Sequence, residues 1–232
     1  MKTVVVTGGV RGIGRAIAEA FLAKGYRTCV CYSKDEDGAQ EVRAIGMEAY
    51  RVDVRDEDAV MAFFAQIGNV DILVNNAGVS LWAMIQDTSA AQFDDLFAVN
   101  MRGTFLCCRE ALKSMLSNHS GLIVNVSSVW GEVGGCCESV YSASKGAVLA
   151  FTKALAKEVG YSGIRVNAVS PGMIDTKMNA RFSEDDLVVI RDETLAGRFG
   201  RVDEVAQAVL FLEENEYVTG IDLPINGGFS IV

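Results

Sequence analysis

Short, almost continuous apolar runs alternate along the chain with longer stretches in which apolar residues recur every three or four positions. The short runs predict strands buried on both faces, and the longer stretches predict amphipathic helices. The expected strands are residues 3–6, 28–32, 49–52, 72–74, 122–126, 165–169 and 220–223. The expected helices are residues 13–24, 36–45, 56–67, 90–117, 141–159 and 203–213.

Buried strands that alternate with helical crossovers predict an α/β protein. The expected architecture is a Rossmann-type, doubly wound sheet of seven parallel strands with helices on both faces. We find no internal repeat, low-complexity tract or linker-like segment in the 232 residues. Residues 1–232 are therefore expected to form a single domain.

The longest segment without a predicted strand is residues 173–200. It contains Met173 and Met178, an acidic helix start at Ser183-Glu184-Asp185-Asp186, and the flexible Gly197 and Gly200. Insertions beyond the carboxyl end of a strand often cover bound ligands. We therefore expect a substrate lid here, with a plain surface loop as the alternative.

The net charge of −9 argues against nucleic acid or an anionic membrane surface as a partner. No run approaches the roughly 18 apolar residues of a membrane span. The first strand begins within three residues of Met1, which leaves no room for a signal peptide. The expected location is the cytoplasm.

The cysteines and histidine restrict the chemistry. Six cysteines fall in three close pairs: Cys29 and Cys31, Cys107 and Cys108, Cys136 and Cys137. The first two pairs lie in a predicted strand and a predicted helix, as small buried hydrophobes do. With no C-x-x-C spacing and one histidine, His119 in a polar loop, neither a metal site, zinc included, nor a Ser-His-Asp triad is expected.

A glycine-rich loop, Thr7-Gly8-Gly9-Val10-Arg11-Gly12-Ile13-Gly14, joins the first strand to the first helix. In this context Gly8 permits a tight turn, Gly12 lets a pyrophosphate approach the backbone, and Gly14 lets helix and strand pack closely. The positive end of the helix dipole then faces the phosphates. The loop predicts a dinucleotide cofactor.

The end of the second strand bears on which dinucleotide binds. A site for NAD usually places an acid there to hold the ribose hydroxyls. This chain has Tyr32-Ser33-Lys34 instead, and Arg11 lies in the glycine loop. Two cations and a hydroxyl suit a 2′-phosphate, so NADP is favoured over NAD. Asp35 and Glu36 follow at once, and a small shift in register would let one of them bind the ribose.

Tyr141 and Lys145 lie four residues apart, and Ser128 precedes Tyr141 by thirteen positions. Residues i and i+4 share one helix face, so the lysine cation is expected beside the phenol. A neighbouring cation favours the phenolate and suits a tyrosine to general acid–base catalysis. On its own the pair is equally consistent with a surface helix. Ser127 competes with Ser128, but only one of two successive residues at a strand end can face Tyr141.

Together these motifs resemble the short-chain dehydrogenase/reductase family over essentially the whole chain. The matching segments are Thr7 to Gly14, Asp53-Val54, Asn75-Asn76-Ala77-Gly78, Asn100, Ser128, Tyr141 with Lys145, and Pro171-Gly172 followed by Thr176. The resemblance implies a catalytic tetrad. In it Tyr141 is the general acid or base, Lys145 assists it and binds the nicotinamide ribose, Ser128 polarises the carbonyl, and Asn100 anchors a water.

The resemblance also implies further cofactor contacts and an assembly. Asp53 and Val54 would frame the adenine, the Asn75 to Gly78 segment would support the cofactor backbone, and Ile174 and Thr176 would hold the carboxamide after Pro171-Gly172. A homotetramer or homodimer is implied. The expected pocket wall consists of soft side chains, namely Trp130, Cys136, Cys137, Met173 and Met178, although loop packing alone would also explain the first three.

Within the family, the glycine loop, the 171–176 turn and the 220–228 end look most like bacterial 3-oxoacyl-[acyl carrier protein] reductases. Those enzymes dock an acidic carrier through basic residues, but the matching stretches here are Ser117-Asn118-His119-Ser120 and Gly160-Tyr161-Ser162, without Lys or Arg. A reductase of the 5-aminopentanone-modified lysine of elongation factor P and a steroid or small-ketone reductase are the enzymatic alternatives. A nucleotide-sensing regulator is the non-enzymatic one.

Overall fold

Seven parallel strands form one sheet in the computed structural model, which describes residues 1–176 and 183–231. The strands are β1 (Thr3–Thr7), β2 (Arg27–Tyr32), β3 (Glu48–Arg51), β4 (Ile72–Asn75), β5 (Gly121–Val126), β6 (Ile164–Pro171) and β7 (Asp222–Ile225). Their order, β3-β2-β1-β4-β5-β6-β7, reverses direction between β1 and β4. This confirms the predicted doubly wound fold.

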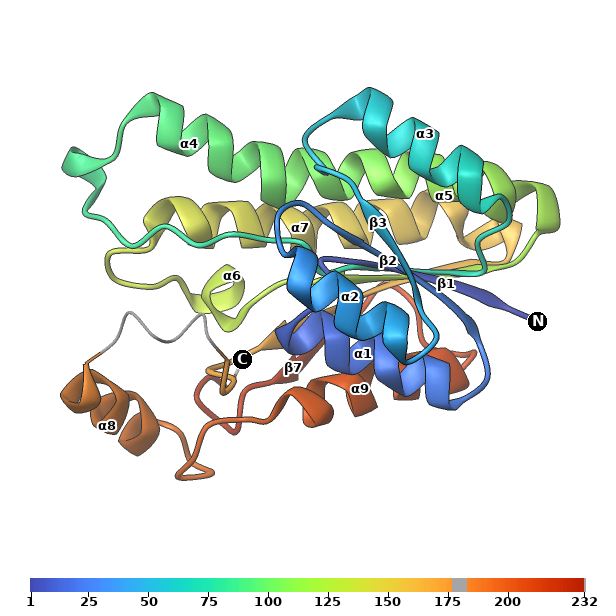
Figure 1. The fold of residues 1–232 in the computed structure, drawn as a ribbon. Coiled ribbons are helices and arrows are strands. Elements are labelled where there is room, and N and C mark those ends of the chain that lie inside the picture. The colour runs from blue at the N-terminus through green and yellow to red at the C-terminus, as the bar shows by residue number, and fades with distance from the viewer. Residues whose placement is uncertain (177–182, 232) are drawn as a thin grey trace.

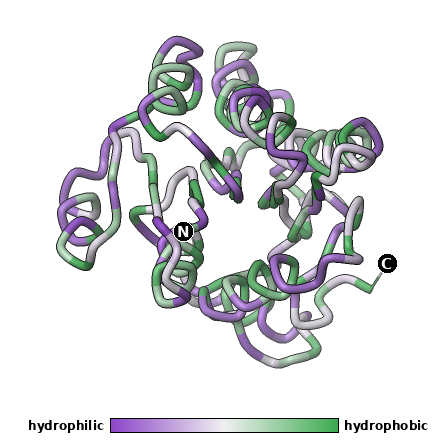
Figure 2. Tube along the Cα trace, turned by 90° about the vertical axis from the view of Figure 1, so that its right-hand side faces the viewer, coloured by the Kyte–Doolittle hydropathy of each residue, from purple (hydrophilic) through white to green (hydrophobic). Residues whose placement is uncertain are grey.

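Helices cover both faces of the sheet (Figure 1). One layer contains α1 (Gly12–Ala23), α2 (Glu36–Ala44) and α9 (Val202–Glu214), and the other contains α3 (Glu57–Ile67), α5 (Gly103–Asn118) and α7 (Ser139–Val159). Within β1, Val4 and Val6 pack into the first layer and Val5 into the second. The helices in Figure 2 are banded in green and purple, as expected for helices with one face on a core.

The predicted helix over residues 90–117 is two α-helices with a π-helical segment between them. α4 (Ala90–Phe97) precedes the π-helical segment Ala98–Arg102, and α5 follows it directly. The Asn100 side chain in this segment is bonded to the backbone of Val79 in a different loop. Such a wide turn commonly marks a functional position and leaves no signature in the hydrophobic pattern.

Two other elements differ from the sequence prediction. The short helix α6 (Val129–Val133), capped by Ser128, was not expected. The last strand begins two residues later than predicted, at Asp222, because the Ile221 N–H donates to the Asn167 side chain and Gly220 is in a left-handed conformation. Two 3₁₀ turns, Ile85–Asp87 and Gly160–Ser162, complete the connections.

The expected acidic helix start is present in the 173–200 segment. α8 (Glu184–Glu193) begins after Ser183, whose hydroxyl accepts from the Asp186 N–H at 3.2 Å. In Figure 1 α8 stands apart from the sheet, on the side of α6 and the C-terminus. Residues 177–182, which include Met178, lie outside the described residues. In the described part of the chain, no helix is both long and apolar enough to cross a membrane.

The cysteines on the sheet and on α5 are buried as predicted. Cys29, Cys31, Cys107 and Cys108 are at most 1% exposed and belong to the hydrophobic core. The predicted polar position of His119 is also confirmed, since it is exposed at the end of α5. Cys136 and Cys137 lie instead at the surface, in the loop between α6 and α7.

Candidate active site

Two loops at the carboxyl ends of β1 and β4 are joined by the side chains of Thr7, which ends β1, and Asn76, which follows β4. The Thr7 hydroxyl accepts from the N–H groups of Asn76 and Ala77, at 3.0 and 2.9 Å. In return, the Asn76 amide donates to the carbonyls of Thr7 and Gly8, at 3.0 and 3.1 Å. Because the strand order reverses between β1 and β4, this crevice is the ligand-binding position of doubly wound sheets.

The glycine loop has the shape that a dinucleotide requires. Gly8 and Gly12 have φ values of +64° and +55°, in the left-handed region that favours glycine. A Cβ on Gly14 would lie 2.3 Å from the Asn76 amide nitrogen, whereas one on Gly12 would meet only the Thr176 methyl, at 3.8 Å. The loop is therefore crowded at Gly14 and open at Gly12.

The N-terminus of α1 is free to bind an anion. No side chain caps it, and its first turn contains no acidic residue. The first N–H groups of a helix need acceptors from outside the helix, and the helix dipole favours a negative charge there. A pyrophosphate bound next to Gly12 would supply both the hydrogen-bond acceptors and the negative charge. The loop therefore fits the dinucleotide that the sequence predicts.

Both acids after β2 are engaged in other contacts. The Asp35 carboxylate accepts from the Gly38 N–H at 3.1 Å as the cap of α2, and it lies 3.9 Å from the Arg11 guanidinium. Glu36 accepts from the Tyr32 hydroxyl at 2.6 Å and from Arg43 at 2.8 Å. The Tyr32 hydroxyl is therefore turned toward α2, and its ring is buried.

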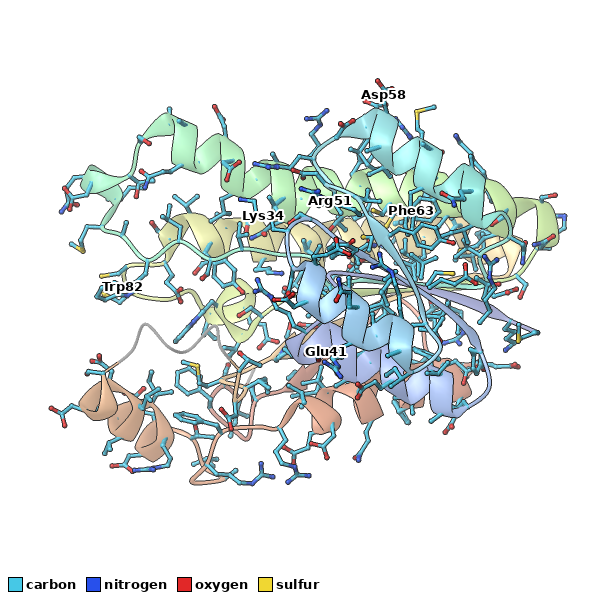
Figure 3. The ribbon with its side chains drawn as sticks, in the orientation of Figure 1. Lys34, Glu41, Arg51, Asp58, Phe63 and Trp82 are labelled. Atoms are coloured by element: carbon cyan, nitrogen blue, oxygen red, sulfur yellow. The ribbon has the colours of Figure 1, made fainter. Side chains whose placement is uncertain are left out.

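Arg51, at the end of β3, adds a cation that the sequence did not predict at this site. β3 pairs with β2 so that Arg51 lies opposite Tyr32, and its Nε donates to the Ser33 carbonyl at 3.3 Å. Lys34 and Arg51 are both exposed and lie near one another in Figure 3. With Arg11, three cations surround the end of β2.

Asp53 and Val54, which are expected to frame the adenine, follow β3. Arg55 forms a double hydrogen bond with the Asp53 carboxylate, and this contact lowers the pKa of that carboxyl. Val54 packs against Gly103, at the start of α5, where a Cβ would approach its side chain to 2.7 Å. Asn75 points into the core, donating to Asn125 at 2.9 Å, so Asn76 rather than Asn75 contacts the glycine loop.

Tyr141 and Lys145 occupy one face of α7. The Lys145 ammonium donates to the Val126 carbonyl at 2.8 Å and lies 5.9 Å from the centre of the Tyr141 ring. Burial of Lys145 lowers its pKa to about 8, so the side chain is still mainly charged at neutral pH. The face that the spacing predicts is thus present, with a cation beside the phenol.

Asn100 lies close to this pair. Its side-chain carbonyl accepts from the Val79 N–H at 2.9 Å, and its amide donates to the Val79 carbonyl and to the Ser144 hydroxyl, at 2.9 and 3.0 Å. A Cβ on Gly78 would be 3.4 Å from both Asn100 Oδ1 and Lys145 Nζ. The π-helical segment and α7 therefore bring Asn100 and Lys145 to the same position beside Gly78.

The two candidate serines have different partners. Ser127 donates to the Lys145 carbonyl at 3.0 Å and is buried against α7. Ser128 is the cap of α6, and its hydroxyl accepts from the Trp130 N–H at 3.2 Å, which leaves its proton available for another acceptor. The hydroxyl of Ser128 is therefore better suited than that of Ser127 to donate to a ligand.

The segment after β6 lies opposite the glycine loop. Gly172 packs so closely on Asn226 that a Cβ would come within 2.9 Å of it. Ile174 is buried and bridges to Gly200. Thr176, the last described residue before the gap, has its methyl group facing Gly12.

The predicted pocket wall is only partly brought together. Trp130 packs edge-to-face on Phe229, with ring centres 5.3 Å apart, and Gly135 lies against the indole. The Cys137 thiol lies beside Met84, and the Cys136 thiol lies 3.8 Å from that of Cys137. Met173 is half-buried. A cavity of about 330 Å³ lies at the backbone segment that Asn100 binds. It is lined by Val79, Ser80, Leu81, Ala91, Gln92, Asp95 and Leu96.

Residues missed by the sequence interpretation are Arg51, Asn76 as a contact of the glycine loop, Ser144, Phe229 and Met84. Arg51 could have been found only from the pairing of β2 with β3. Ser144 lies between Tyr141 and Lys145, and a serine at that position does not by itself indicate a contact with Asn100. Phe229 contacts Trp130, and Met84 contacts Cys137. Both are distant from these partners in the sequence, so only the folded chain shows the contacts.

Comparison with known proteins agrees with this geometry. The short chain dehydrogenase family model matches residues 2–187. The chain is 40% identical over 235 residues to carbonyl reductase family member 4 of Xenopus laevis, covering 99% of this chain and 98% of that protein. It is 38% identical over 237 residues to the 3-oxoacyl-[acyl-carrier-protein] reductase of Homo sapiens, covering 100% and 99%. It is 37% identical over 238 residues to the uncharacterized oxidoreductase YmfI of Bacillus subtilis (strain 168), covering 98% of each. The chain therefore belongs to the short-chain dehydrogenase/reductase family of oxidoreductases.

Proposed function

We propose that this protein is an NADP-dependent reductase that interconverts a ketone and a secondary alcohol. The observation that carries the proposal is the position of the Lys145 ammonium, which lies 5.9 Å from the centre of the Tyr141 ring and, together with Asn100, beside Gly78. A family member that serves only as a nucleotide-sensing regulator would not need all of these groups together with Ser128.

Reduction of a ketone places negative charge on its oxygen, so donors that converge there stabilise the transition state. We assign that role to the hydroxyls of Ser128 and Tyr141. The bound nicotinamide supplies the hydride. Tyr141 transfers its proton to the oxygen, and the Lys145 cation stabilises the phenolate that remains.

Lys145 and Asn100 support this proton transfer. The Lys145 ammonium has donors to spare beyond its bond to the Val126 carbonyl, and we assign one of them to the nicotinamide ribose. Asn100, in the wide turn beside it, would anchor a water through which Tyr141 is reprotonated. The adjoining Val79 backbone is fixed by Asn100, which keeps the turn in place.

NADP is preferred to NAD in this proposal. Asp35 and Glu36, the two acids that could hold the ribose hydroxyls, are occupied by a helix cap and by Tyr32 and Arg43. Arg11, Lys34 and Arg51 surround the same position with positive charge. Cations at such a site stabilise a 2′-phosphate through charge-assisted hydrogen bonds.

The proposed substrate is a 3-oxoacyl-type or other compact ketone that is not delivered by an acidic carrier protein. The relatives named above include a carbonyl reductase and a 3-oxoacyl-[acyl-carrier-protein] reductase. The surface stretches that would dock a carrier present exposed His119 and Tyr161 in place of basic side chains. A net charge of −9 would also repel an acidic partner. A reductase of the 5-aminopentanone-modified lysine of elongation factor P and a steroid or small-ketone reductase would also reduce a ketone, so both stay as alternatives.

We propose that two or four copies of the chain assemble. Phe105 and Leu116 are each 43% exposed on α5. They lie eleven residues apart, about three helical turns, and so share one face. A second copy covering this face would remove apolar surface from water. Light scattering coupled to gel filtration will measure the mass, and a monomer at micromolar concentration would contradict this assembly.

The function is tested by Tyr141→Phe, because the Tyr141 hydroxyl, on a residue also expected to bind the cofactor, is needed for proton transfer but not for the glycine-loop contacts. NADPH oxidation will be measured across 3-oxoacyl thioesters, small aminoketones and oxosteroids. We expect wild-type turnover of at least one class, loss of nearly all of it in the variant, and retained NADPH binding by fluorescence. Wild-type protein that binds NADPH but reduces no ketone would favour the regulator.

A further inference from the structure

Three sulfur atoms gather at the surface where the loop before α7 meets the loop after β4. The Cys137 Sγ lies 3.4 Å from the Met84 Sδ and 3.8 Å from the Cys136 Sγ. Met84 is 48% exposed, Cys136 is exposed and Cys137 is half-buried. Trp82, two residues before Met84, is labelled in Figure 3 at this end of the molecule. The cluster is thus accessible from solvent.

The backbone holds the cluster together. The Ala83 N–H donates to the Cys137 carbonyl at 2.8 Å, which ties the two loops to each other. Gly135 donates its N–H to the Ser142 hydroxyl on α7, at 3.0 Å. Cys137 has a φ of +59°, a left-handed conformation that a residue with a Cβ seldom adopts. Uncommon backbone conformations of this kind tend to occur at ligand sites.

The donor set is chemically soft. Soft thiolate and thioether ligands favour copper(I), zinc and iron–sulfur clusters, and thioether ligands in particular suit copper(I). With metal–sulfur bonds of about 2.3 Å, ligands at trigonal or tetrahedral angles are separated by roughly 3.8–4.0 Å. The two measured separations, 3.4 and 3.8 Å, are close to this range. Small side-chain rotations would therefore suffice to seat an ion.

Zinc fits these side chains poorly. It takes four ligands, chosen from Cys, His and carboxylates, in its structural sites. The described residues contain no group of three or more His, Cys, Asp or Glu side chains suited to a metal. The third sulfur of this cluster belongs to a methionine, which is not among those zinc ligands, and a metal ion here would depart from the sequence expectation of no metal site.

We propose that Met84, Cys136 and Cys137 form a binding site for a soft monovalent metal ion, copper(I). The ion binds both cysteines as thiolates and displaces two protons to solvent, while the thioether binds without loss of a proton. The oxidation state of the metal does not change. Cys136 and Cys137 precede Tyr141 in the sequence by five and four residues, in the loop that leads into α7.

The test is copper(I) uptake by the reduced protein under anaerobic conditions, in competition with a bathocuproine chelator. We expect the wild type to bind a single ion. Met84→Leu should weaken binding by about tenfold, and the double variant Cys136→Ser with Cys137→Ser by about a hundredfold or more. Met61→Leu, a methionine 42% exposed on α3, is the matched control and should bind as the wild type does. X-ray absorption should show a three-sulfur shell.

Wild-type affinity in the double serine variant would overturn the proposal, and so would equal effects of Met84→Leu and Met61→Leu. Circular dichroism of each variant will establish that it is folded. The chelator readout does not depend on turnover. A failure here is therefore distinguishable from a failure of the proposed reductase function.

Discussion

The side-chain amide of Asn100 donates to the Ser144 hydroxyl at 3.0 Å, and that hydroxyl donates in turn to the Tyr141 carbonyl at 2.7 Å. This chain of bonds joins the π-helical segment to the helix that carries Tyr141 and Lys145. Ser144 is fully buried between them. We regard it as a positioning residue, because it orients Asn100 relative to α7.

Ser144→Ala should lower kcat by about tenfold and destabilise the protein by about 1–2 kcal/mol, because a buried Asn100 donor loses its partner. NADPH affinity should change little. The measurements are steady-state kinetics, denaturant unfolding and cofactor titration. Ser114→Ala, which removes a hydroxyl bonded to the Val70 N–H at 3.2 Å, is the control for stability loss alone. Equal kcat effects of the two changes would refute the positioning role.

The three cations around the β2 end should determine cofactor preference. The Arg11→Ala and Lys34→Ala double variant should lose most of the preference for NADPH, and Arg51→Ala alone should reduce it by about tenfold. The measurement is kcat/KM with NADPH and with NADH. Lys157→Ala serves as control because it removes an exposed lysine in the last turn of α7, which belongs to the other helical layer from α1 and α2. Equal wild-type efficiency with both cofactors would contradict the assignment.

The buried Lys145 cation should lower the free energy of unfolding below pH 8. Its folded pKa of about 8 lies below the unfolded value of about 10.4, so the buried cation costs free energy at neutral pH and this cost fades between pH 8 and 10.4. Lys145→Met should therefore raise the free energy of unfolding at pH 7 by roughly 1–3 kcal/mol, and by less at pH 9.5. Urea unfolding at both values will measure this.

The matched control for that experiment is Lys153→Met, which replaces an exposed lysine on the same helix. It should show no pH-dependent gain in stability. A gain for Lys145→Met that is the same at pH 7 and pH 9.5 would mean that packing, and not the buried charge, is responsible.

Glu132 should make the fold less stable as pH rises toward neutrality. Burial, with the neighbouring Asp222 carboxylate, raises the pKa of Glu132 to about 7. Its carboxylate oxygens are buried, and neither has a hydrogen-bond partner among the described residues. The folded state therefore holds this proton more tightly than the unfolded state, and stability falls between about pH 4.5 and 7.

Glu132→Gln should remove this dependence. The variant should be more stable than the wild type at pH 8, by roughly 1–3 kcal/mol, and nearly equal to it at pH 5. Denaturant unfolding at the two pH values will measure the difference. Glu158→Gln, which changes an exposed residue on α7, should behave like the wild type throughout. A pH-independent effect of Glu132→Gln would disprove the argument.

Attachment of the substrate to an acyl carrier protein should not raise kcat/KM. We expect similar kcat/KM for a 3-oxoacyl group on a short thioester and on acyl carrier protein, because the surface lacks basic residues at the expected docking stretches. The measurement compares both substrates at low and high salt. An increase of about tenfold or more with the carrier, lost at high salt, would instead indicate electrostatic docking.

Hydrophobic periodicity was sufficient to predict the layers of the fold. Continuous apolar runs can be buried only between two helical layers, so the pattern predicted the seven parallel strands and most helices. Local spacing also predicted the glycine loop and the shared face of Tyr141 and Lys145, because both features depend on bonds within a few residues. The buried positions of Cys29, Cys31, Cys107 and Cys108 followed from the same pattern.

Which distant residues meet is known only from the folded chain. The π-helical turn at Asn100 depends on Val79, and the cation from Arg51 depends on the pairing of β3 with β2. The sulfur cluster depends on the hydrogen bond between Ala83 and Cys137. These contacts join segments that are remote in the chain. Hydrophobic periodicity indicates whether a side chain is buried, but it does not indicate which polar group of a distant segment will contact it.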